Sequence, residues 1–269
     1  MLEIPPRVKE GKKLVARTTR NTHKIMLDLV TAQKPTRVLD AACAHGMFAW
    51  KLVQQGIEAY CFDCNPDGFM LEGVDFRVGD LTRPPLDYPD GFFDTVACVD
   101  GIEHLENPFQ AIREFCRILR PGGLLVMSTP NVNLISSRLR FLLTCHHTKF
   151  KRPLNEAKPD PDHHIMPIAF PWLRYMLHTN GFRITAVRTN QMRASGLLCA
   201  WLWPFVALLT WNMYRREKKY PAQRLRNREI LATLLSPALF FGETLVVAAE
   251  KIQAHLLQSP EKHATKLAD

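Results

Sequence analysis

Short apolar runs that alternate with stretches of helical spacing constrain the fold of this chain more than any other feature. One helical stretch covers 46–55, and another begins at Pro108 and ends before Gly122. The apolar runs cover 36–41, 57–63, 74–80, 92–100 and 124–129. Near-continuous apolar strands separated by helices are typical of a parallel sheet with helices on both faces. The sequence therefore predicts an α/β fold with a doubly wound sheet.

Composition narrows the class of protein. Hydrophobic residues make up 46% of the 269 residues and charged residues 23%, which excludes a disordered or collagen-like chain. The seven cysteines are an odd number scattered through apolar runs, which favours a reducing compartment over a disulfide framework. Residues 1–7 contain no apolar stretch of the kind that a secretory signal needs. We therefore expect a cytoplasmic protein.

The net charge of +9 is distributed unevenly along the chain. Between residues 40 and 106 there are thirteen acids against three bases. Residues 131–152 carry five bases and no acid, and residues 190–242 carry eight bases against two acids. The acidic half suits a cationic ligand, and the basic segments suit phosphates or anionic lipid.

Acidic and small residues follow the first two predicted strands. In a sheet of this kind, ligands bind outside the carboxyl ends of the strands. Asp40 ends the first strand, and small residues follow it as far as Gly46, so that a ligand can approach the backbone N–H groups closely. Asp63 ends the second strand, where a carboxylate can accept both hydroxyls of a ribose.

The next two strands also end in residues with chemical functions. Asp80 follows the third strand, where an acid beside the apolar Leu81 can accept a hydrogen bond from an exocyclic amine. Asp100, Glu103 and His104 follow the fourth strand as a carboxylate-rich cluster. We expect all of these side chains at one edge of the sheet.

The loop after the first strand does not fit a nicotinamide or flavin site. That fingerprint would place glycines at positions 42, 44 and 47, where this chain has Ala42, Ala44 and Met47. An acid followed by small residues two, four and six positions later fits Asp40, Ala42, Ala44 and Gly46 instead. A phosphate-binding loop of the Walker type is absent from the sequence.

Residues 38–131 resemble class I S-adenosylmethionine (SAM)-dependent methyltransferases of the ubiquinone-biosynthesis-like, or type 11, group. The matching motifs are the D-x-A-x-A-x-G loop from Asp40, Asp63, the G-D-L of 79–81, the F-D-T-V of 93–96, the E-H of 103–104 and the L-R-P-G-G of 119–123. The resemblance implies a Rossmann-like, seven-stranded sheet with a helical insertion between its last two strands. It also implies SAM as the cofactor.

The resemblance further implies roles for individual residues. Those expected to bind the cofactor are Asp40, Ala42, Ala44 and Gly46 for the methionine part, Asp63 with its neighbour Cys64 for the ribose, Asp80 with Leu81 for the adenine, and Asp100. Because SAM is a sulfonium cation, an acidic site suits it.

One departure from the family pattern affects this expectation. The family usually has glycine where this chain has Ala42 and Ala44. An alanine held at positive φ costs roughly 1–2 kcal/mol, and its methyl group could press on the cofactor. A catalytically inactive scaffold that binds partners through the same fold is therefore an alternative.

His104 is the predicted general base, with Glu103 beside it. A histidine with a near-neutral pKa can remove the proton of a hydroxyl acceptor. The alternative is that both residues only cap and orient the following loop. The residues by themselves leave both interpretations open.

A divalent metal is a second interpretation of the same cluster. Asp100, Glu103 and His104 resemble the E-x-x-E-H set that binds a metal in ubiquinone-pathway and small-RNA 2′-O-methyltransferases, and His163 or His164 would complete it. Aspartate is shorter than the family's first glutamate. Zinc at Cys61 and Cys64 is disfavoured, because no second cysteine pair accompanies them.

The second half contains a long uncharged stretch over 194–214 with three tryptophans. The helix expected over 170–179 leads to strands over 182–189 and 244–249, which would be antiparallel neighbours in this fold. A membrane crossing between them would need a partner, and the apolar run over 230–241 is too short. We expect an interfacial or re-entrant helical hairpin, with a packed lid or a dimer interface as the alternative.

The predicted organisation has four parts. They are an N-terminal helical segment over 1–34, a methyltransferase domain over 35–190 plus 243–252, an apolar helical insertion over 191–242, and a tail over 253–269.

We expect O-methylation of a membrane-associated acceptor, a lipid-linked glycan or a prenylated quinol, on the inner face of a membrane. Residues 162–182 resemble a segment of family members in glycan and lipid-linked saccharide pathways. Alternatives are a soluble small-molecule methyltransferase with a helical lid and the inactive scaffold; nucleic acid is disfavoured as a partner, because the basic segments alternate with long aliphatic runs.

Overall fold

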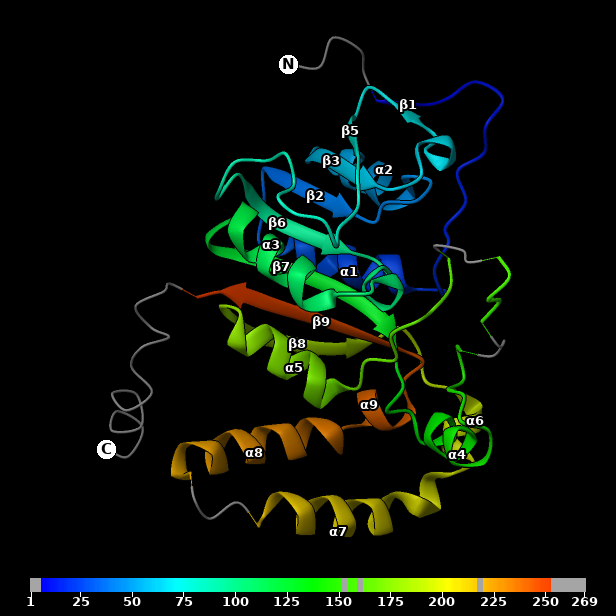
Figure 1. The fold of residues 1–269 in the computed structure, drawn as a ribbon, viewed down its shortest axis with the longest axis vertical. Helices are drawn as coiled ribbons and strands as arrows, with labels where there is room; N and C mark the ends of the chain where they lie inside the picture. Colours follow the sequence, from blue (N-terminus) through cyan, green and yellow to red (C-terminus); the bar gives the residue numbers. More distant parts are fainter. Residues whose placement is uncertain (1–5, 151–153, 159–161, 217–219, 253–269) are drawn as a thin grey trace.

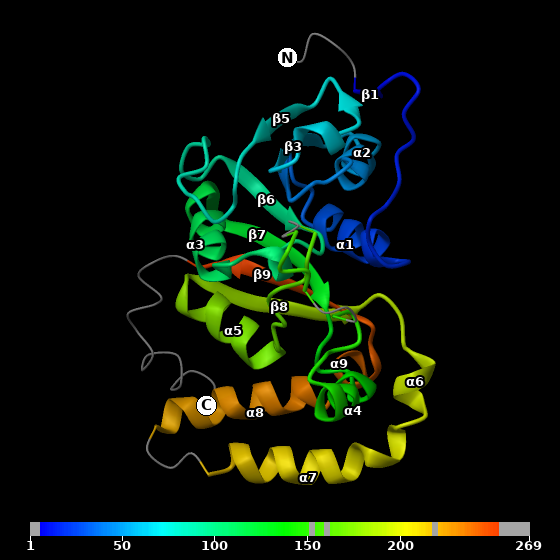
Figure 2. The same cartoon turned by 45° about the vertical axis from the view of Figure 1, so that its right-hand side comes forward.

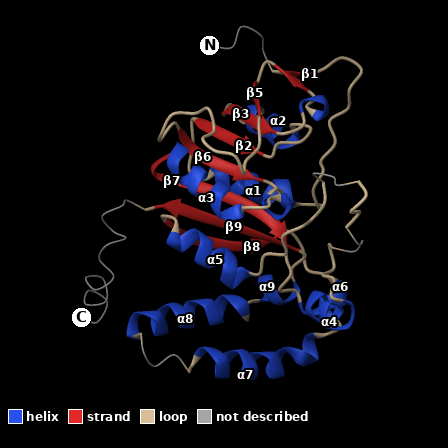
Figure 3. Cartoon of the chain, viewed as in Figure 1, coloured by secondary structure: helices blue, strands red, loops and turns tan. Residues whose placement is uncertain are grey.

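A seven-stranded sheet forms the centre of the molecule (Figures 1 and 3). The computed structural model describes residues 6–150, 154–158, 162–216 and 220–252. The strands are β2 (Arg37–Ala41), β3 (Glu58–Asp63), β5 (Asp75–Val78), β6 (Phe93–Cys98), β7 (Leu119–Pro130), β8 (Phe182–Thr189) and β9 (Thr244–Lys251). Their order is β5-β3-β2-β6-β7-β9-β8, with β9 antiparallel to both of its neighbours. The predicted doubly wound sheet with a helical insertion between its last two strands is confirmed.

Helices cover both faces of the sheet, as the apolar character of the strands predicts (Figure 2). On one face lie α1 (Thr22–Thr31) and α2 (Met47–Val53), which bury Met26 and Phe48 against the strands. On the other face lie α3 (Pro108–Ile118) and α5 (Phe170–Thr179), which bury Phe115 and Phe170. The two hydrophobic cores fix the sheet, so that its carboxyl edge is a rigid platform.

Several boundaries differ from the sequence prediction. The N-terminal helix begins only at Thr22, and Leu14 lies in irregular chain before it. The third predicted strand is shorter than expected, because the chain turns after Val78 and the Gly79 amide donates to the Asp63 carbonyl (3.0 Å). A two-stranded sheet of β1 (Arg7–Val8) and β4 (Leu71–Glu72), joined to β3 through the short helix η1 (Pro66–Gly68), was not predicted.

The insertion between β8 and β9 is helical. It consists of α6 (Ala194–Leu197), η3 (Ala200–Leu202), α7 (Trp203–Tyr214), α8 (Pro221–Leu234) and α9 (Pro237–Phe241). Ile230 and Leu234 of α8 join the core, and α7 lies outside α8 at the end of the molecule farthest from β1 (Figure 1). Within the described residues, every helix is too short or too polar to cross a membrane. The predicted tail over 253–269 lies outside the described residues.

Asn131 fastens this insertion to the sheet. Its side-chain amide donates to the backbone carbonyls of Leu239 (2.8 Å) and Gly242 (2.9 Å), and its carbonyl accepts from the Asn133 amide (3.0 Å). The residue is 4% exposed and comes directly after β7. A buried amide that satisfies two carbonyls in this way ties the end of α9 to the carboxyl edge.

We predict that Asn131→Ala lowers the free energy of unfolding by about 2–4 kcal/mol, because it leaves buried carbonyls without partners. Asn131→Asp should cost more, since carboxylate oxygens would face those carbonyls. Urea denaturation measures both values. The control is Asn107→Ala, which removes the exposed cap of α3 and should cost about 1 kcal/mol. A loss no larger than that of the control would contradict the fastening role.

Candidate functional site

The loop after β2 is held against the end of β3 by backbone hydrogen bonds. The amides of Ala42 (2.9 Å) and Cys43 (3.2 Å) both donate to the Phe62 carbonyl, and the Ala44 amide donates to Asp63 Oδ2 (2.8 Å). The loop turns into α2 at Gly46, where φ is 86° and a Cβ would lie 2.9 Å from the side chain of Leu71. Glycine is therefore required at this position.

Ala42 and Ala44 both have left-handed backbone conformations, with φ of 59° and 47°. Gly101 makes room for the first of the two methyl groups, since a Cβ on Gly101 would lie 2.7 Å from the Cβ of Ala42. The loop after β6 thus accommodates the methyl group of Ala42.

Asp40 is buried beneath this loop, with 1% of its surface exposed. Its Oδ2 accepts from the Ala49 amide (3.0 Å), whereas its Oδ1 has no hydrogen-bond partner among the described residues. Burial raises the pKa of Asp40 to about 8, and the charge of Asp63 acts in the same direction against the Ala49 hydrogen bond. A cation that reached Asp40 would favour its ionised form.

Asp63 and Asp80 lie at the ends of the next two strands. Asp63 uses one oxygen for the Ala44 amide and the other for the Asn65 amide (2.9 Å), and each oxygen keeps a further lone pair. The exposed thiol of Cys64 is next to it. Asp80 accepts from the Thr82 amide (2.8 Å) and hydroxyl (2.7 Å), beside the buried Leu81.

Asp100 is bound in a way that the sequence did not indicate. The hydroxyls of Ser128 and Thr18 donate to its two carboxylate oxygens, each at 2.5 Å. Desolvation raises the pKa of Asp100, and these two hydrogen bonds oppose the rise. Its φ of 46° turns the chain out of β6 into the short helix η2 (Ile102–His104).

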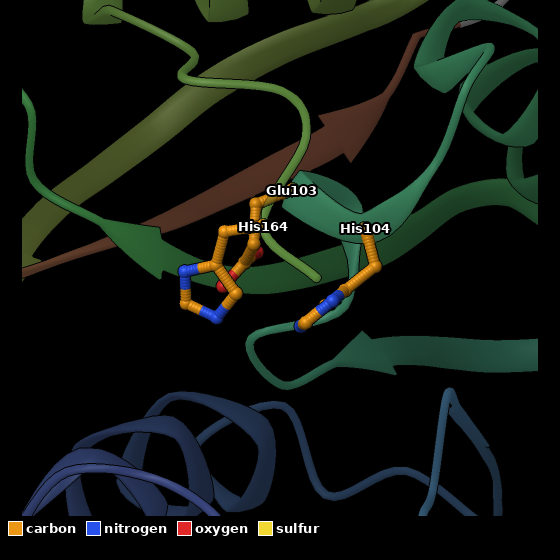
Figure 4. A group of neighbouring side chains, drawn as sticks. All are labelled: Glu103, His104 and His164. Carbon is orange, nitrogen blue, oxygen red and sulfur yellow. The ribbon is translucent and has the colours of Figure 1, made fainter. Parts of the chain in front are cut away.

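Glu103, His104 and His164 form a cluster at this edge, with ligand atoms within 4.8 Å of one another (Figure 4). The rings of His104 and His164 meet edge to face, with centroids 4.6 Å apart. The predicted metal set is therefore brought together in three of its four members. Asp100 is not among the residues whose ligand atoms lie this close, and its two oxygens accept hydrogen bonds from Ser128 and Thr18.

Glu103 is fully buried, and neither of its carboxylate oxygens meets hydrogen-bond geometry with a described residue. Burial raises the pKa of Glu103 well above its usual range, and the charge of Asp100 adds to the rise although the Thr129 hydroxyl opposes it. Burial also lowers the pKa of His164 to about 4, so that this imidazole is neutral at pH 7. A cation between these groups would relieve an unpaired buried acid.

The hydrogen bond of His104 fixes which of its nitrogens carries the proton. Nδ1 lies 3.0 Å from the backbone carbonyl of His163. A carbonyl oxygen only accepts, so Nδ1 is the donor, and in the neutral ring the lone pair is on Nε2. The backbone of Ile165 and Met166 holds the facing segment through amides that donate to the Glu103 carbonyl (3.0 and 2.9 Å). Nε2 is therefore available to take a proton or to bind a metal.

The cofactor and base regions form one site. Burial raises the pKa of the Cys98 thiol, and the charges of Glu103, Asp40 and Asp100 all add to the rise. Strands β2 and β6 are neighbours in the sheet, with Asp40 opposite Ala97 and Ala41 opposite Cys98, so the acids that follow these two strands lie at adjacent strand ends. This charge distribution attracts a cation to the carboxyl edge.

Residues far from the strand ends in the sequence also contact the site, and no sequence motif indicated them. Thr18 reaches Asp100 from the chain before α1, and Arg17 pairs with Asp162. Lys149 binds Glu243 (2.7 Å), and its charge acts on His164 and Asp100. No local pattern marks these positions, because their role depends on how the segments around the sheet meet.

The sheet order with one antiparallel strand, and the acids at its carboxyl edge, define the class I methyltransferase fold. A family model described as "Methyltransferase domain" matches residues 14–188, and the chain belongs to that family. It carries a class I SAM-dependent methyltransferase domain with distant similarity to ubiquinone biosynthesis O-methyltransferases.

Two curated relatives carry this similarity. The ubiquinone biosynthesis O-methyltransferase of Xanthomonas campestris pv. campestris is 32% identical over 119 residues, which are 40% of this chain and 49% of the relative. That of Xylella fastidiosa is 29% identical over 127 residues, 43% of this chain and 51% of the relative. The chain thus matches about half the length of these relatives.

Solved structures share the fold. A SAM-dependent methyltransferase from Archaeoglobus fulgidus has a TM-score of 0.53 at 20% identity and covers 86% of this chain and 95% of its own. The YcgJ protein of Bacillus subtilis has a TM-score of 0.51 at 14% identity and covers 86% of this chain and 100% of its own. Each shows similarity in fold alone.

The residues present suit SAM as the methyl donor. Asp40 keeps a buried oxygen without a partner, Asp63 keeps free lone pairs, and acids surround the edge that would receive a cation. The left-handed turns at Ala42 and Ala44 give the loop the shape that glycines would give it.

We predict that Ala42→Gly and Ala44→Gly each raise the free energy of unfolding by about 0.5–1 kcal/mol. The strain of roughly 1–2 kcal/mol that glycine removes exceeds the extra backbone entropy of about 0.5–1 kcal/mol that it introduces. Urea denaturation measures the change. The control is Ala232→Gly, exposed in the right-handed helix α8, which should lose about 0.5–1 kcal/mol. Similar losses in all three variants would show that the loop alanines are unstrained.

Proposed function

We propose that the chain transfers the methyl group of SAM to an oxygen of a membrane-associated acceptor, a lipid-linked glycan or a prenylated quinol. The observation that carries the proposal is the free Nε2 of His104, fixed by the hydrogen bond from Nδ1 to the His163 carbonyl at the mouth of an acidic site. The exposed apolar helix α7 supports a membrane-associated acceptor.

Each site residue has a proposed part in binding. Asp40 and the loop over 42–46 hold the methionine part of SAM, and Asp63 with Cys64 faces the ribose. Asp80 and Leu81 bound the adenine, and Asp100 closes the site from β6. Bound SAM supplies a methyl group activated by a positively charged sulfur.

The proposed chemistry follows from two neighbouring side chains. His104 Nε2 would accept the proton of the acceptor hydroxyl, so that the acceptor oxygen can take the methyl group that SAM would supply. The positive charge that appears on the imidazole lies beside the buried carboxyl of Glu103. That charge favours the ionised form of Glu103, and the ionised carboxylate in turn stabilises the protonated base.

A second role for the same cluster is favoured by the unpartnered Glu103. Glu103, His104 and His164 offer one carboxylate and two imidazoles, which suit Mn²⁺ or Mg²⁺ less well than an all-oxygen set but within the range of ligands seen for such ions. A metal held there would polarise the acceptor hydroxyl. Both roles use His104 Nε2, so only one of them operates.

We predict that Asp63→Ala weakens SAM binding roughly 10²- to 10⁴-fold, through the loss of two charge-assisted hydrogen bonds worth about 1.5–3 kcal/mol each. Titration calorimetry measures the dissociation constant. The control is Asp67→Ala, an exposed acid in the following turn, which should stay within about twofold of the unmodified chain. Equal affinities of Asp63→Ala and the control would exclude the ribose assignment. No heat with the unmodified chain would favour the inactive scaffold.

We predict that His104→Ala slows methyl transfer about 10²- to 10⁴-fold and leaves SAM affinity nearly unchanged, because the residue acts on the acceptor proton. Incorporation of labelled methyl from SAM into a membrane lipid extract measures the rate. The control is His178→Ala on α5, away from the carboxyl edge. Unchanged incorporation by His104→Ala would contradict a role as general base and would indicate that His104 only orients the following loop.

Two further arms separate the remaining alternatives. Loss of incorporation on chelation, with recovery on addition of Mn²⁺, would assign the cluster to a metal in place of acid–base catalysis. Label that partitions into water-soluble product would favour a soluble small-molecule acceptor, with the helical insertion as a lid.

A further inference from the structure

Helix α7 presents an apolar surface on its outer side. None of its twelve residues is buried, although the helix carries no charged side chain. Val206, Ala207, Thr210 and Tyr214 form the partly covered stripe that faces α8. The opposite stripe carries large exposed apolar side chains, where an ordinary surface helix has polar ones.

A second element from a distant part of the sequence extends this surface. Helix α4 (Ile135–Thr144) exposes Leu142 (78%) and Leu143 (82%), and it lies beside α6 (Figures 1 and 2). Ser136 and Ser195 are hydrogen-bonded across the two helices (3.1 Å), and Leu198, which directly follows α6, is 80% exposed. We call the exposed side chains of α4 and of the segment from α6 to α7 the docking face. It includes Leu142, Leu143, Leu198, Trp201, Phe205 and Leu209. Exposed apolar surface gathered from several elements marks an interaction site.

The segments that form the docking face contain basic residues and no acid. Residues 131–150 and 190–216 contain no Asp or Glu, but they contain arginines on α4, before α6 and at the end of α7. The arginine before α6, Arg193, lies 3.8 Å from the buried Glu243. The Arg215 guanidinium stacks on the Trp211 ring, 4.5 Å from its centroid. An apolar centre with tryptophans and a cationic rim complements a bilayer surface with anionic headgroups. A second copy of the chain would bring like charges together across a two-fold axis.

The docking face is connected to the candidate active site by a row of aromatic rings. The ring of Phe141 on α4 stacks on that of His147, with centroids 4.6 Å apart. The ring of Phe150 packs between those of His147 and His164, at centroid distances of 6.2 Å and 5.2 Å. His164 belongs to the cluster with Glu103 and His104. An apolar acceptor that left the bilayer at α4 would therefore meet aromatic surface as far as the base.

We propose that the docking face binds the surface of a bilayer that contains anionic phospholipid, and that it presents the active site to acceptors held in that bilayer. The second part rests on the proposed function. The first part does not, because binding to lipid requires neither SAM nor an acceptor.

Flotation of the full chain with vesicles tests the binding. With vesicles of phosphatidylcholine and phosphatidylglycerol we expect the chain to float, and we expect raised salt or phosphatidylcholine alone to weaken binding. Trp201→Ser and Leu143→Ser should each reduce binding roughly 10- to 100-fold, through the loss of a large apolar side chain from the bilayer. The matched control is Trp172→Ser on α5, where the tryptophan is 69% exposed against 68% for Trp201 but lies outside the docking face.

Three outcomes would overturn the proposal. They are failure of the unmodified chain to float, equal losses for Trp201→Ser and Trp172→Ser, and a dimer in solution that Trp201→Ser dissociates while no flotation occurs. The last result would identify the docking face as an interface between copies. Flotation that persists without methyl transfer to any lipid would count against the proposed function alone.

Discussion

The hydrogen bond from the Ala44 amide to the Asp63 carboxylate is the interaction on which the site depends. It joins the loop after β2 to the end of β3, and the amides of Ala42 and Cys43 reinforce it at the Phe62 carbonyl. The parallel register of β2 and β3 brings these ends level, with Asp40 opposite Cys61. Because all parallel strands end at one edge of the sheet, the acids that follow them lie along that edge.

Burial of these acids has an electrostatic cost. Desolvation raises the pKa of Asp40, Asp100 and Glu103, and the charge of Asp63 adds to the rise at Asp40 as that of Asp100 does at Glu103. Neither Glu103 oxygen nor Asp40 Oδ1 is satisfied by a described residue. Such a site is stabilised by a cation, whether a sulfonium, an imidazolium or a metal. Burial of these acids lowers the stability of the fold when no cation is present.

The helical insertion between β8 and β9 adds an exposed apolar surface to the shared fold. Asn131 and the α8 side chains Ile230 and Leu234 fix it to the sheet, so that α7 stays outside with its apolar stripe uncovered. The same tertiary arrangement places α4 beside α6 and brings the aromatic rings between Phe141 and His164 into contact. Elements that are separate in sequence thereby form one surface next to the chemistry.

The sequence by itself determined the sheet, the order of its main elements and the acids at their ends. Apolar runs bounded by Asp40, Asp63 and Asp100 are local patterns, and local patterns fix strands, helices and turns. It also showed that Ala42 and Ala44 stand where the family usually has glycine. Only the tertiary structure showed that both alanines have positive φ, and that Thr18 and Ser128 bind Asp100 apart from the cluster of Glu103, His104 and His164. It alone revealed the pairing of α4 with α6 and the proton on His104 Nδ1. These features depend on contacts between residues far apart in the chain, and such contacts leave no periodicity in the sequence.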